Sequence, residues 1–451
     1  MLPEALRGAI LWASDAVFGP WTMALLLGTG LFLTVRYRFI QITRFAEAAR
    51  GLIPAETKGA GGALSPFQAF MTALAATIGM GNIAGVATAI VTGGPGAVFW
   101  IWVYGFFATS IKFSEAVLGI RYRRLDGVGL SAGPMHYLSD GLGLKRLGWL
   151  YALIAGVAAL TTTPFTQPNS IAEVFRSQLG IPTWGSGLAL AVLTWLVVVG
   201  GIRKIGRAVE KLTPLKVGLY LAGGLFVIVS HADRIPDVLG LILREAFSVG
   251  AVTGGTAGAG LMVAMRYGIA RGIYANEAGY GTAAVAYGTA RSGQPVQQGL
   301  NAVMEVFIVS MVTSSISAFT ILLTGAWSSA AVKAGEIKGT AVVAAAFDVS
   351  LPGFGGLVVA LCAFLFGYTT LIGWAYYGEQ FLEHVFGPRI TRPYRWVYCL
   401  LIPFGAMAKV DLVWAWGDLM NGLQIFPNLV GVIGLSGVVA AVARERIRAA
   451  S

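Results

Sequence analysis

The chain has 451 residues, of which 56% are hydrophobic and only 12% are charged, and its mean hydropathy is +0.73. Soluble domains carry about 25% charged residues, so this composition excludes a set of water-soluble domains. The net charge of +11 would suggest nucleic-acid binding in a soluble protein. In a membrane protein, basic residues collect in the cytoplasmic loops instead. We therefore expect a polytopic protein whose surroundings are the lipid bilayer, with no nucleic-acid partner and no obligate protein partner.

Apolar runs close to the 20 residues needed to cross a bilayer predict eleven transmembrane segments. Each must be helical, because lipid cannot satisfy the open edge of a sheet. The fold class is therefore all-α and integral to the membrane. The predicted spans, in chain order, are 17–35, 66–91, 94–120, 148–174, 184–200, 212–231, 247–270, 300–325, 353–385, 396–413 and 417–443.

The lysines and arginines are distributed unevenly between the two sides that these spans define. One set of alternating loops holds 23 of them and the other set holds seven. The richer side is predicted to be cytoplasmic, which puts the N-terminus outside and the C-terminus inside. The two remaining residues, Lys112 and Lys216, fall within spans, and we expect Lys112 to pair with Glu115, three residues later in the third span.

The second span is interrupted by the sequence Gly79-Met80-Gly81-Asn82. Two glycines around one residue weaken a helix. A break at membrane depth is tolerated only where it lines a cavity. Close packing of helices through small residues is the alternative explanation, but the buried amide of Asn82 needs a partner and favours a break.

A second glycine-rich stretch includes Gly254 and Gly255 in the seventh span, where helix packing is again the alternative. If the first span is an addition, the other ten form two sets of five, and both glycine stretches fall in the first helix of a set. Because five is odd, the two sets have opposite orientations. Paired broken helices in inverted halves are the sequence indicator of a central site in a secondary transporter. The predicted parts are 1–64 for the extra helix and its loop, 65–235 for the first repeat and 236–451 for the second.

Three blocks of the sequence resemble the alanine or glycine:cation symporter family, of the amino acid-polyamine-organocation superfamily. They are Thr72–Tyr122, which contains Gly-Met-Gly-Asn-Ile-Ala-Gly and Gly-Gly-Pro-Gly-Ala, then Arg271–Thr282 and Thr369–Glu379. The resemblance covers nearly the whole chain. It implies the leucine-transporter-type 5+5 inverted repeat with one extra N-terminal helix. It also implies symport of small neutral amino acids, alanine or glycine, with sodium as the co-transported ion, in the bacterial plasma (inner) membrane.

An amino acid brings a carboxylate and an ammonium group that must both be satisfied away from water. Exposed N–H groups around Gly79, Met80 and Gly81, with the positive end of the following half-helix, can take the carboxylate. Asn82 is expected to accept from the ammonium or to support a cation, and a structural tie across the break is its alternative role. Gly254 and Gly255 would line the site from the second break.

The fourth span contributes Phe165 and Gln167 as candidate binding residues. The family carries a glutamine at the position of Gln167, although an amide could equally bond to backbone freed by the prolines on either side. Phe165 could cap the pocket, while plain packing is the ordinary role of such an aromatic.

The resemblance places Thr369 and Thr370 opposite the carbonyls of Ala75 and Ile78, around a sodium ion, because hard oxygen ligands suit such a cation. Without the resemblance, the threonines would be expected to bond to carbonyls of their own helix. Trp374, one helical turn after Thr370, would wall the pocket and favour alanine or glycine over larger substrates.

Two residues depart from the family's pattern: Met80 replaces a small hydroxyl residue and Val309 replaces a polar one. No carboxylate is expected at the centre of the membrane, which argues against proton coupling, and Glu277 is expected to act at the inner gate or in the loop. Proton-coupled symport stays the first alternative and a channel the second. The sequence Gly129-Leu-Ser-Ala-Gly133 has the form of a hydrolase elbow, but it lies in a basic loop of a helical protein, so we expect no enzyme.

Overall fold

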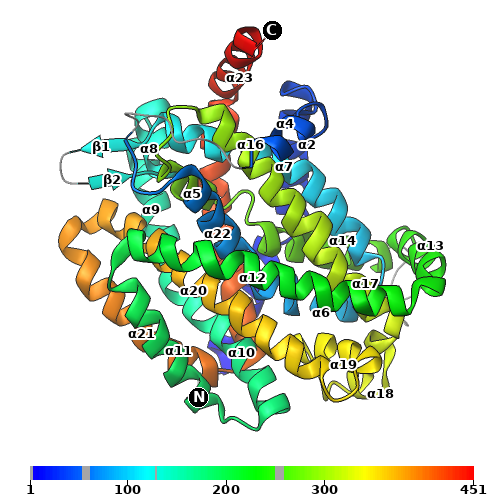
Figure 1. Ribbon diagram of the computed structural model, residues 1–451. Helices are drawn as coiled ribbons and strands as arrows, with labels where there is room; N and C mark the ends of the chain where they lie inside the picture. The colour runs from blue at the N-terminus through cyan, green and yellow to red at the C-terminus, as the bar shows by residue number, and fades with distance from the viewer. Residues whose placement is uncertain (1–3, 53–60, 127–128, 249–258, 451) are drawn as a thin grey trace.

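The computed structural model describes residues 4–52, 61–126, 129–248 and 259–450, and these residues are almost entirely helical (Figure 1). One two-stranded antiparallel hairpin departs from the all-helical prediction, with Arg124 opposite Ser131. It consists of β1 (Arg124–Asp126) and β2 (Gly129–Ser131). The chain begins with α1 (Glu4–Val17), α2 (Pro20–Arg36), α3 (Ile40–Thr43) and α4 (Phe45–Arg50).

The second predicted span is confirmed as a broken helix. It consists of α5 (Pro66–Thr77), the short η1 (Met80–Asn82) and α6 (Ala84–Gly93), and its two halves are bent by 55°. A capping box of Ser65 and Gln68 starts α5. Gly79 is extended and interrupts the regular helix, so side chains supply partners to some backbone groups at the break, such as the carbonyl of Ile78 and the N–H of Met80.

The rest of the first half continues in chain order with long apolar helices joined by short turns. Its elements are α7 (Ala97–Arg121), α8 (Pro134–His136), η2 (Tyr137–Gly141), α9 (Lys145–Thr161), α10 (Thr163–Leu179), α11 (Thr183–Val198), α12 (Gly201–Ser230), η3 (Ala232–Arg234) and α13 (Ile235–Ala246). The amphipathic α13 lies outside every predicted span.

The second half begins in the described chain at α14 (Ala259–Asn276). It continues with α15 (Thr282–Gly288), α16 (Pro295–Val306), η4 (Phe307–Thr313), α17 (Ser314–Thr324), η5 (Ala326–Ser328), α18 (Ala330–Lys333), α19 (Thr340–Ser350), α20 (Gly355–Phe386), η6 (Pro388–Ile390), α21 (Thr391–Met407), α22 (Val410–Gly434) and α23 (Ser436–Ala450). The short α19 was not predicted, and the last span is shifted, because α22 begins at Val410 and a 51° bend separates it from α23.

Within the described residues, six helices are long and apolar enough to cross a membrane, or eight if each bent pair counts as one span. The predicted number of eleven is thus not established. Of the other predicted spans, α11 has 16 residues and α21 has 17, while 247–270 lies partly outside the described residues.

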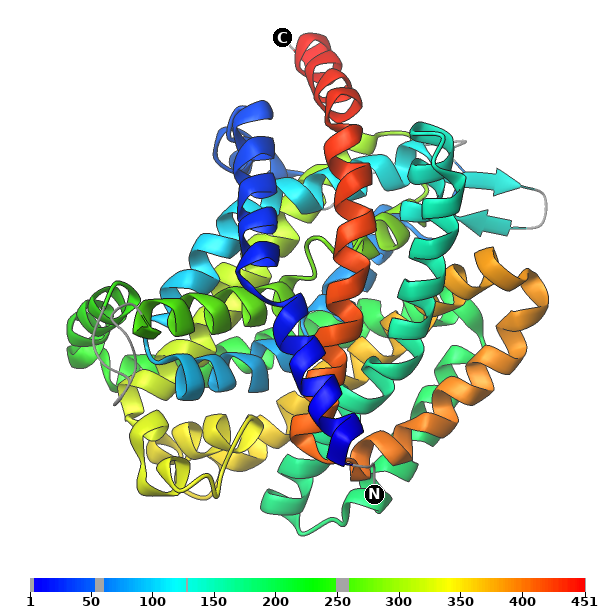
Figure 2. The same ribbon diagram turned by 180° about the vertical axis from the view of Figure 1, so that it is seen from behind.

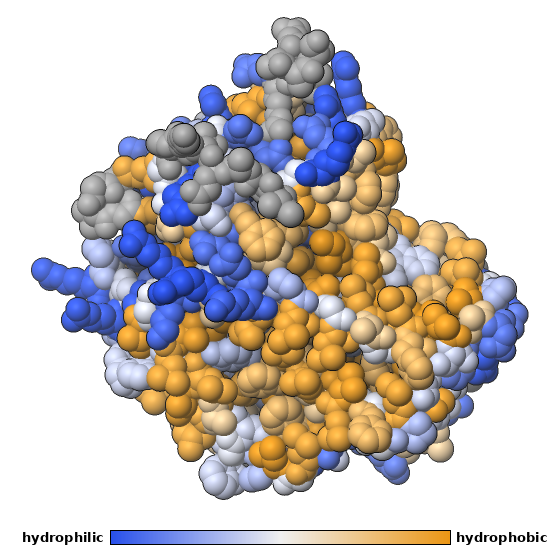
Figure 3. Space-filling model, viewed as in Figure 1, coloured by the Kyte–Doolittle hydropathy of each residue, from blue (hydrophilic) through white to orange (hydrophobic). Residues whose placement is uncertain are grey.

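The broken helix lies at the centre of the packing. Helices α12 and α20 pack against α5, and α14 packs against α6. Seen from behind, α22 runs past α1 and α9, and the two chain ends lie at opposite ends of the molecule (Figure 2). The space-filling view shows a wide apolar surface, with hydrophilic side chains gathered in the upper part of the view (Figure 3).

Main-chain bonds join the chain just before α5 to the chain just after α15. Leu64 and Ala290 form an isolated parallel bridge. The N–H groups of Ala63 and Leu64 both donate to the carbonyl of Thr289, at 2.9 and 3.1 Å, and the N–H of Arg291 donates to the carbonyl of Leu64 at 2.8 Å. The Arg123 guanidinium crosses the same junction and donates to the carbonyls of Gly61, Gly288, Ala290 and Ser292.

Candidate functional site

A small cavity lies at the break between α5 and α6. Its volume is about 10 Å³, which is the room needed for a single water molecule. Side chains and backbone from α5, α10, α14, α20 and α22 surround it. The lining residues are Ala76, Thr77, Gly79, Gly81, Thr163, Gln167, Tyr274, Glu277, Tyr280, Thr370, Trp374 and Asn421.

The structure brings five of the predicted binding residues together around this cavity, and they are Gly79, Gly81, Gln167, Thr370 and Trp374. Three other predicted binding residues do not line it. Met80 and Asn82 are buried beside it, and the main chain of Phe165 faces Gly405 of α21. Gly254 and Gly255 lie outside the described residues.

At the break, one backbone N–H donates to a side chain instead of to a helix carbonyl. The N–H of Met80 donates to Oε1 of Gln167 at 3.1 Å. This is a group that the sequence assigns to the carboxylate of a substrate. The amide of Gln167 therefore satisfies the broken helix, and it would have to exchange that bond with an incoming carboxylate.

Gly79 and Gly81 allow the neighbouring helices to approach the break closely. A Cβ on Gly79 would lie 2.6 Å from Oγ1 of Thr370, and a Cβ on Gly81 would lie 2.9 Å from Cδ1 of Tyr274. Both distances are shorter than any ordinary contact. Glycine is required here for space, since Gly79 has a φ of −123° that any residue adopts.

Asn82 ties the two sides of the break together, which is the structural alternative considered for it. Its Nδ2 donates to the carbonyl of Thr77 at 3.0 Å, and its Oδ1 accepts from the hydroxyls of Thr313 and Ser314, both at 3.1 Å. Its own carbonyl accepts from Ser317. Both acceptor positions of Oδ1 and one N–H of Nδ2 are thus used by protein groups.

The four residues predicted as sodium ligands lie next to one another, and a lysine lies among them. Nζ of Lys216, on α12, donates to the carbonyls of Ala75 at 3.1 Å and Ile78 at 2.6 Å, and to Oγ1 of Thr369 at 2.6 Å. Oγ1 of Thr370 donates to the carbonyl of Ala75 at 3.1 Å. The sequence showed that Lys216 lies within a span but not which way it points.

Glu277 lines the cavity, although no carboxylate was expected at the site. Its Oε1 accepts from Nε1 of Trp374 at 2.7 Å, and its Oε2 accepts from Oγ1 of Thr282 at 2.8 Å. Glu277 is one of the few non-glycine residues with a positive φ, 58°, which turns the chain after α14 back toward the cavity. The sequence offered Asn276-Glu277-Ala278-Gly279 as its only signal.

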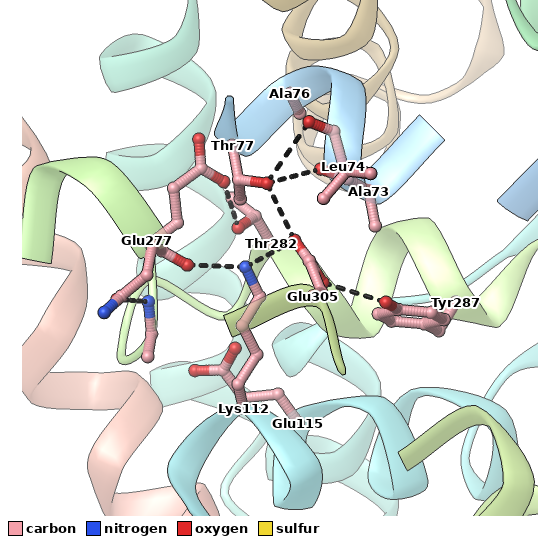
Figure 4. Close-up of polar contacts among 12 residues, drawn as sticks. Ala73, Leu74, Ala76, Thr77, Lys112, Glu115, Glu277, Thr282, Tyr287 and Glu305 are labelled. Atoms are coloured by element: carbon pink, nitrogen blue, oxygen red, sulfur yellow. Dashed lines mark hydrogen bonds and ion pairs between the residues drawn. The ribbon is translucent and has the colours of Figure 1, made fainter. Parts of the chain in front are cut away.

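The predicted pairing of Lys112 with Glu115 is wrong. Lys112 is instead paired with Glu305 of α16, with Nζ 2.8 Å from Oε1, and both side chains are buried (Figure 4). Oε1 of Glu115 accepts from Nδ2 of Asn428 at 2.8 Å and from the N–H groups of Gly279 and Gly281. Although they are three apart on α7, the two side chains reach different neighbours, Lys112 the carboxylate of Glu305 and Glu115 the neutral donors around Gly279.

Glu305 also connects this ion pair to the site. It accepts from Oγ1 of Thr77 at 2.9 Å and from the hydroxyl of Tyr287 at 2.8 Å (Figure 4). Since Thr77 lines the cavity, the last turn of α5 is held by a buried, charged network.

A second cavity has a volume of about 240 Å³. Arg271, which lines it, forms an ion pair with Asp418, and Tyr274, which lines the small cavity, donates its hydroxyl to Oγ1 of Thr166 at 2.9 Å. The larger cavity carries both signs of charge, with Glu173, Arg271, Lys338 and Asp411 in its lining. A third cavity, of about 570 Å³, lies further along α20 on the opposite side, and its lining includes the Glu379–Arg395 ion pair.

The hydrolase-like sequence has some of the expected surroundings but lacks an acid partner in the part of the chain described. Ser131 ends β2, and its Oγ lies 2.7 Å from Nε2 of His136, whereas Nδ1 of His136 has no hydrogen-bond partner. Burial, followed by the charges of His384 and Arg124, lowers the pKa of His136 to about 3. A catalytic triad would need a group at Nδ1 to orient this ring.

The sequence was compared with known protein families and matches one of them. Residues 4–449 match the sodium:alanine symporter family. The chain is 39% identical to the sodium/alanine symporter AgcS of Methanococcus maripaludis, over 94% of this chain and 93% of that protein. It is 38% identical to an uncharacterized transporter of Haemophilus influenzae, over 96% and 94%. It is 32% identical to the putative sodium/proton-dependent alanine carrier protein YrbD of Bacillus subtilis, over 96% and 89%.

Solved structures show the same fold at low sequence identity. MhsT in complex with L-phenylalanine matches with a TM-score of 0.57 at 12% identity, over 85% of this chain and 99% of that one. A manganese transporter of Eremococcus coleocola matches with a TM-score of 0.52 at 16% identity, over 83% and 78%. These likenesses establish the leucine-transporter type of fold. The chain belongs to the sodium:alanine symporter family and is a multi-pass membrane transporter, not an enzyme.

Proposed function

We propose that this protein carries small neutral amino acids, with alanine and glycine as first candidates, across the bacterial plasma membrane together with a cation. The supporting observation is the cavity at the α5–α6 break, which brings the backbone of the break, where the Met80 N–H is held by the exchangeable amide of Gln167, and a carboxylate into one small space. A cavity of about 10 Å³ has to expand for any substrate, and the smallest amino acids require the least expansion.

The two charged ends of an amino acid have complementary groups in the cavity. The N–H groups around Gly79–Gly81 would take the substrate carboxylate after Gln167 releases Met80. The carboxylate of Glu277 would face the ammonium, with Trp374 holding it in place. Both ends would then be satisfied in a space without bulk water, as burial of a zwitterion requires.

The arrangement of the three cavities supports transport by alternating access. In the proposed orientation, with the N-terminus outside, the cavity of about 240 Å³ is the outer entrance and the one of about 570 Å³ is the cytoplasmic exit. The Arg271–Asp418 and Tyr274–Thr166 contacts would open outward. We propose that 65–235 and 236–451 are the two repeats that move against each other.

Sodium is the first candidate for the coupling ion, because the family is named for it. Protons are the second candidate, and the buried carboxylate of Glu277 in the cavity lining favours them. Ionisable groups inside a membrane protein commonly serve proton pathways.

Counterflow is the test of the carrier itself. Proteoliposomes loaded with unlabelled alanine should accumulate labelled alanine transiently with no ion gradient, and the rate should saturate. Equilibration of the label with neither transient accumulation nor saturation would indicate a channel, and no uptake of alanine, glycine or a panel of neutral amino acids would reject the proposed function. Inward gradients of sodium and of protons, imposed separately, then identify the coupling ion by which one gives an overshoot.

Replacing Trp374 by leucine should widen the substrate range. The indole lines the cavity and is 3% exposed, so its loss frees room beside the substrate side chain. One methylene in an apolar pocket changes discrimination by roughly 10-fold or more, so the preference for alanine over valine should fall by at least about tenfold in kcat/KM. The change in preference is measured by how well unlabelled valine competes with the uptake of labelled alanine.

Trp184→Leu is the control, since Trp184 is 60% exposed on α11. An unchanged preference in Trp374→Leu would remove Trp374 from the substrate pocket.

A further inference from the structure

The side chain of Lys216 ends among the oxygens that the family resemblance assigns to sodium. It comes from α12, is fully buried, and reaches the end of α5 and the middle of α20. Its Nζ lies 2.6 Å from the carbonyl oxygen of Ile78, 2.6 Å from Oγ1 of Thr369 and 3.1 Å from the carbonyl oxygen of Ala75. A lysine ammonium has three N–H donors, and all three are used.

The groups around Nζ of Lys216 favour a positive charge there, although none of its hydrogen-bond partners is a carboxylate. The carbonyls of Ala75 and Ile78 are at the C-terminal end of the half-helix α5, where the helix dipole stabilises cations. The ring of Phe366 lies 5.3 Å from Nζ and adds a cation–π contact. The hydrogen bonds of Lys216 go to neutral oxygens only.

The helices packed against α12 contribute few charged groups near Lys216. Three of them, α5, α11 and α17, and the η4 segment contain no Asp, Glu, Lys, Arg or His in their described residues. On α20 the nearest acidic residue in sequence to Thr369 is Glu379, almost three turns away and paired with Arg395. On α19, Asp348 accepts from the N–H of Gly356. No neighbouring carboxylate therefore takes over the pairing of this ammonium in the described chain.

A sodium ion cannot share these oxygens with the ammonium. Any position within reach of the Ala75 and Ile78 carbonyls and the Thr369 hydroxyl would be in contact with Nζ, and two positive charges at contact repel strongly in a medium of low dielectric constant. The predicted ligands are therefore present, but the place they surround is already filled.

We propose that the ammonium group of Lys216 is a tethered cation that replaces the sodium ion at this site, so that the protein binds no sodium there. A charge held on α12 stabilises the broken helix as an ion would, but it is not released into the cytoplasm. A sodium gradient then does no work through this site. This last consequence rests on the proposed transport function, whereas the occupancy of the site by Lys216 does not.

Thermal stability tests the occupancy without any substrate. The purified full-length protein is heated in NaCl, KCl or choline chloride, each at about 0.15 M. Any rise of the wild-type midpoint in NaCl over the other two salts should be unchanged in Thr369→Ala. Lys216→Ala should be destabilised in KCl and choline chloride, and sodium should raise its midpoint by several degrees, because a ligand that binds only the folded state stabilises it. Lys211→Ala is the matched control, since Lys211 is an exposed lysine on the same helix.

A sodium-specific rise of the wild-type midpoint that is lost in Thr369→Ala would overturn the proposal, because it would place sodium among these oxygens despite Lys216. If Lys216→Ala does not fold, the wild-type protein can still test the proposal. The measurement is then the uptake of labelled sodium into proteoliposomes that alanine stimulates. The proposal expects any such uptake to be unchanged in Thr369→Ala, and stimulated sodium uptake abolished by Thr369→Ala would refute it. Failure of alanine counterflow would count against the proposed function and leave the salt comparison of midpoints to decide the role of Lys216.

Discussion

Replacing Gly79 by alanine is expected to lower alanine uptake by at least about 100-fold, which corresponds to roughly 2.8 kcal/mol of lost binding. The added methyl group would lie 2.6 Å from Oγ1 of Thr370 and 3.1 Å from Oε1 of Gln167, in the space where the substrate carboxylate is proposed to bind. The backbone itself permits alanine, with φ −123° and ψ −157°. The overlap with Thr370 should also lower the stability of the fold, so the transport rate has to be compared per amount of folded protein.

Initial rates of labelled alanine counterflow, normalised to the amount of protein that elutes as a single species, measure this effect. Gly218→Ala is the control, because a Cβ on Gly218 of α12 meets no atom within 4 Å. That variant should transport like the wild type and gain slightly in stability, as alanine is the better helix former. Counterflow by Gly79→Ala within a few-fold of the wild type would show that the carboxylate binds elsewhere.

Breaking the Lys112–Glu305 pair is expected to cause the largest loss of stability. Both side chains are buried, at 1% and 0% exposure, and removing one partner leaves an uncompensated charge. Each of Lys112→Met and Glu305→Gln should cost about 3–5 kcal/mol. The double variant should lose much less than the sum of the two, because it leaves no unpaired charge behind.

Thermal midpoints of the two single variants and the double variant, in the same detergent, give the cycle. Arg244→Met is the control for loss of a surface ion pair, since the Arg244–Glu245 contact is 3.7 Å long and exposed, and its midpoint should barely change. Additive losses in the cycle would mean that Lys112 and Glu305 act independently, the hydrogen bonds of Glu305 to Thr77 and Tyr287 then being its main role.

The broken helix could be predicted from the sequence because its cause is local. Gly79 and Gly81 weaken the helix wherever the segment lies in the fold, and the structure bends there by 55°. The closeness of Ala75, Ile78, Thr369 and Thr370 came from the family resemblance rather than from the residues, since nothing in the sequence alone brings α5 and α20 together.

The partners of buried charges could not be predicted in the same way. Lys112 and Glu115 are neighbours along α7, but their side chains point to α16 and to the turn after α14, which depends on helix packing. Lys216 reaches the proposed ion position only because α12 packs across α5 and α20. Glu277 reaches the cavity through a left-handed backbone conformation that no pattern around it requires.

The junction between the chain before α5 and the chain after α15 is held mainly by main-chain atoms, at Ala63, Leu64, Thr289 and Arg291. Main-chain bonds do not depend on the identity of the side chains, so substitutions that the buried packing of Leu64 and Thr289 tolerates should leave these bonds in place, apart from proline, which removes an N–H. Mutational drift would then change the bonds of this junction little, while contacts built from side chains, such as the Arg271–Asp418 ion pair, are free to diverge. If the two ends of the site open in turn, evolution would accordingly adjust the balance between them mainly at the Arg271–Asp418 end, and at the junction through side chains such as Arg123.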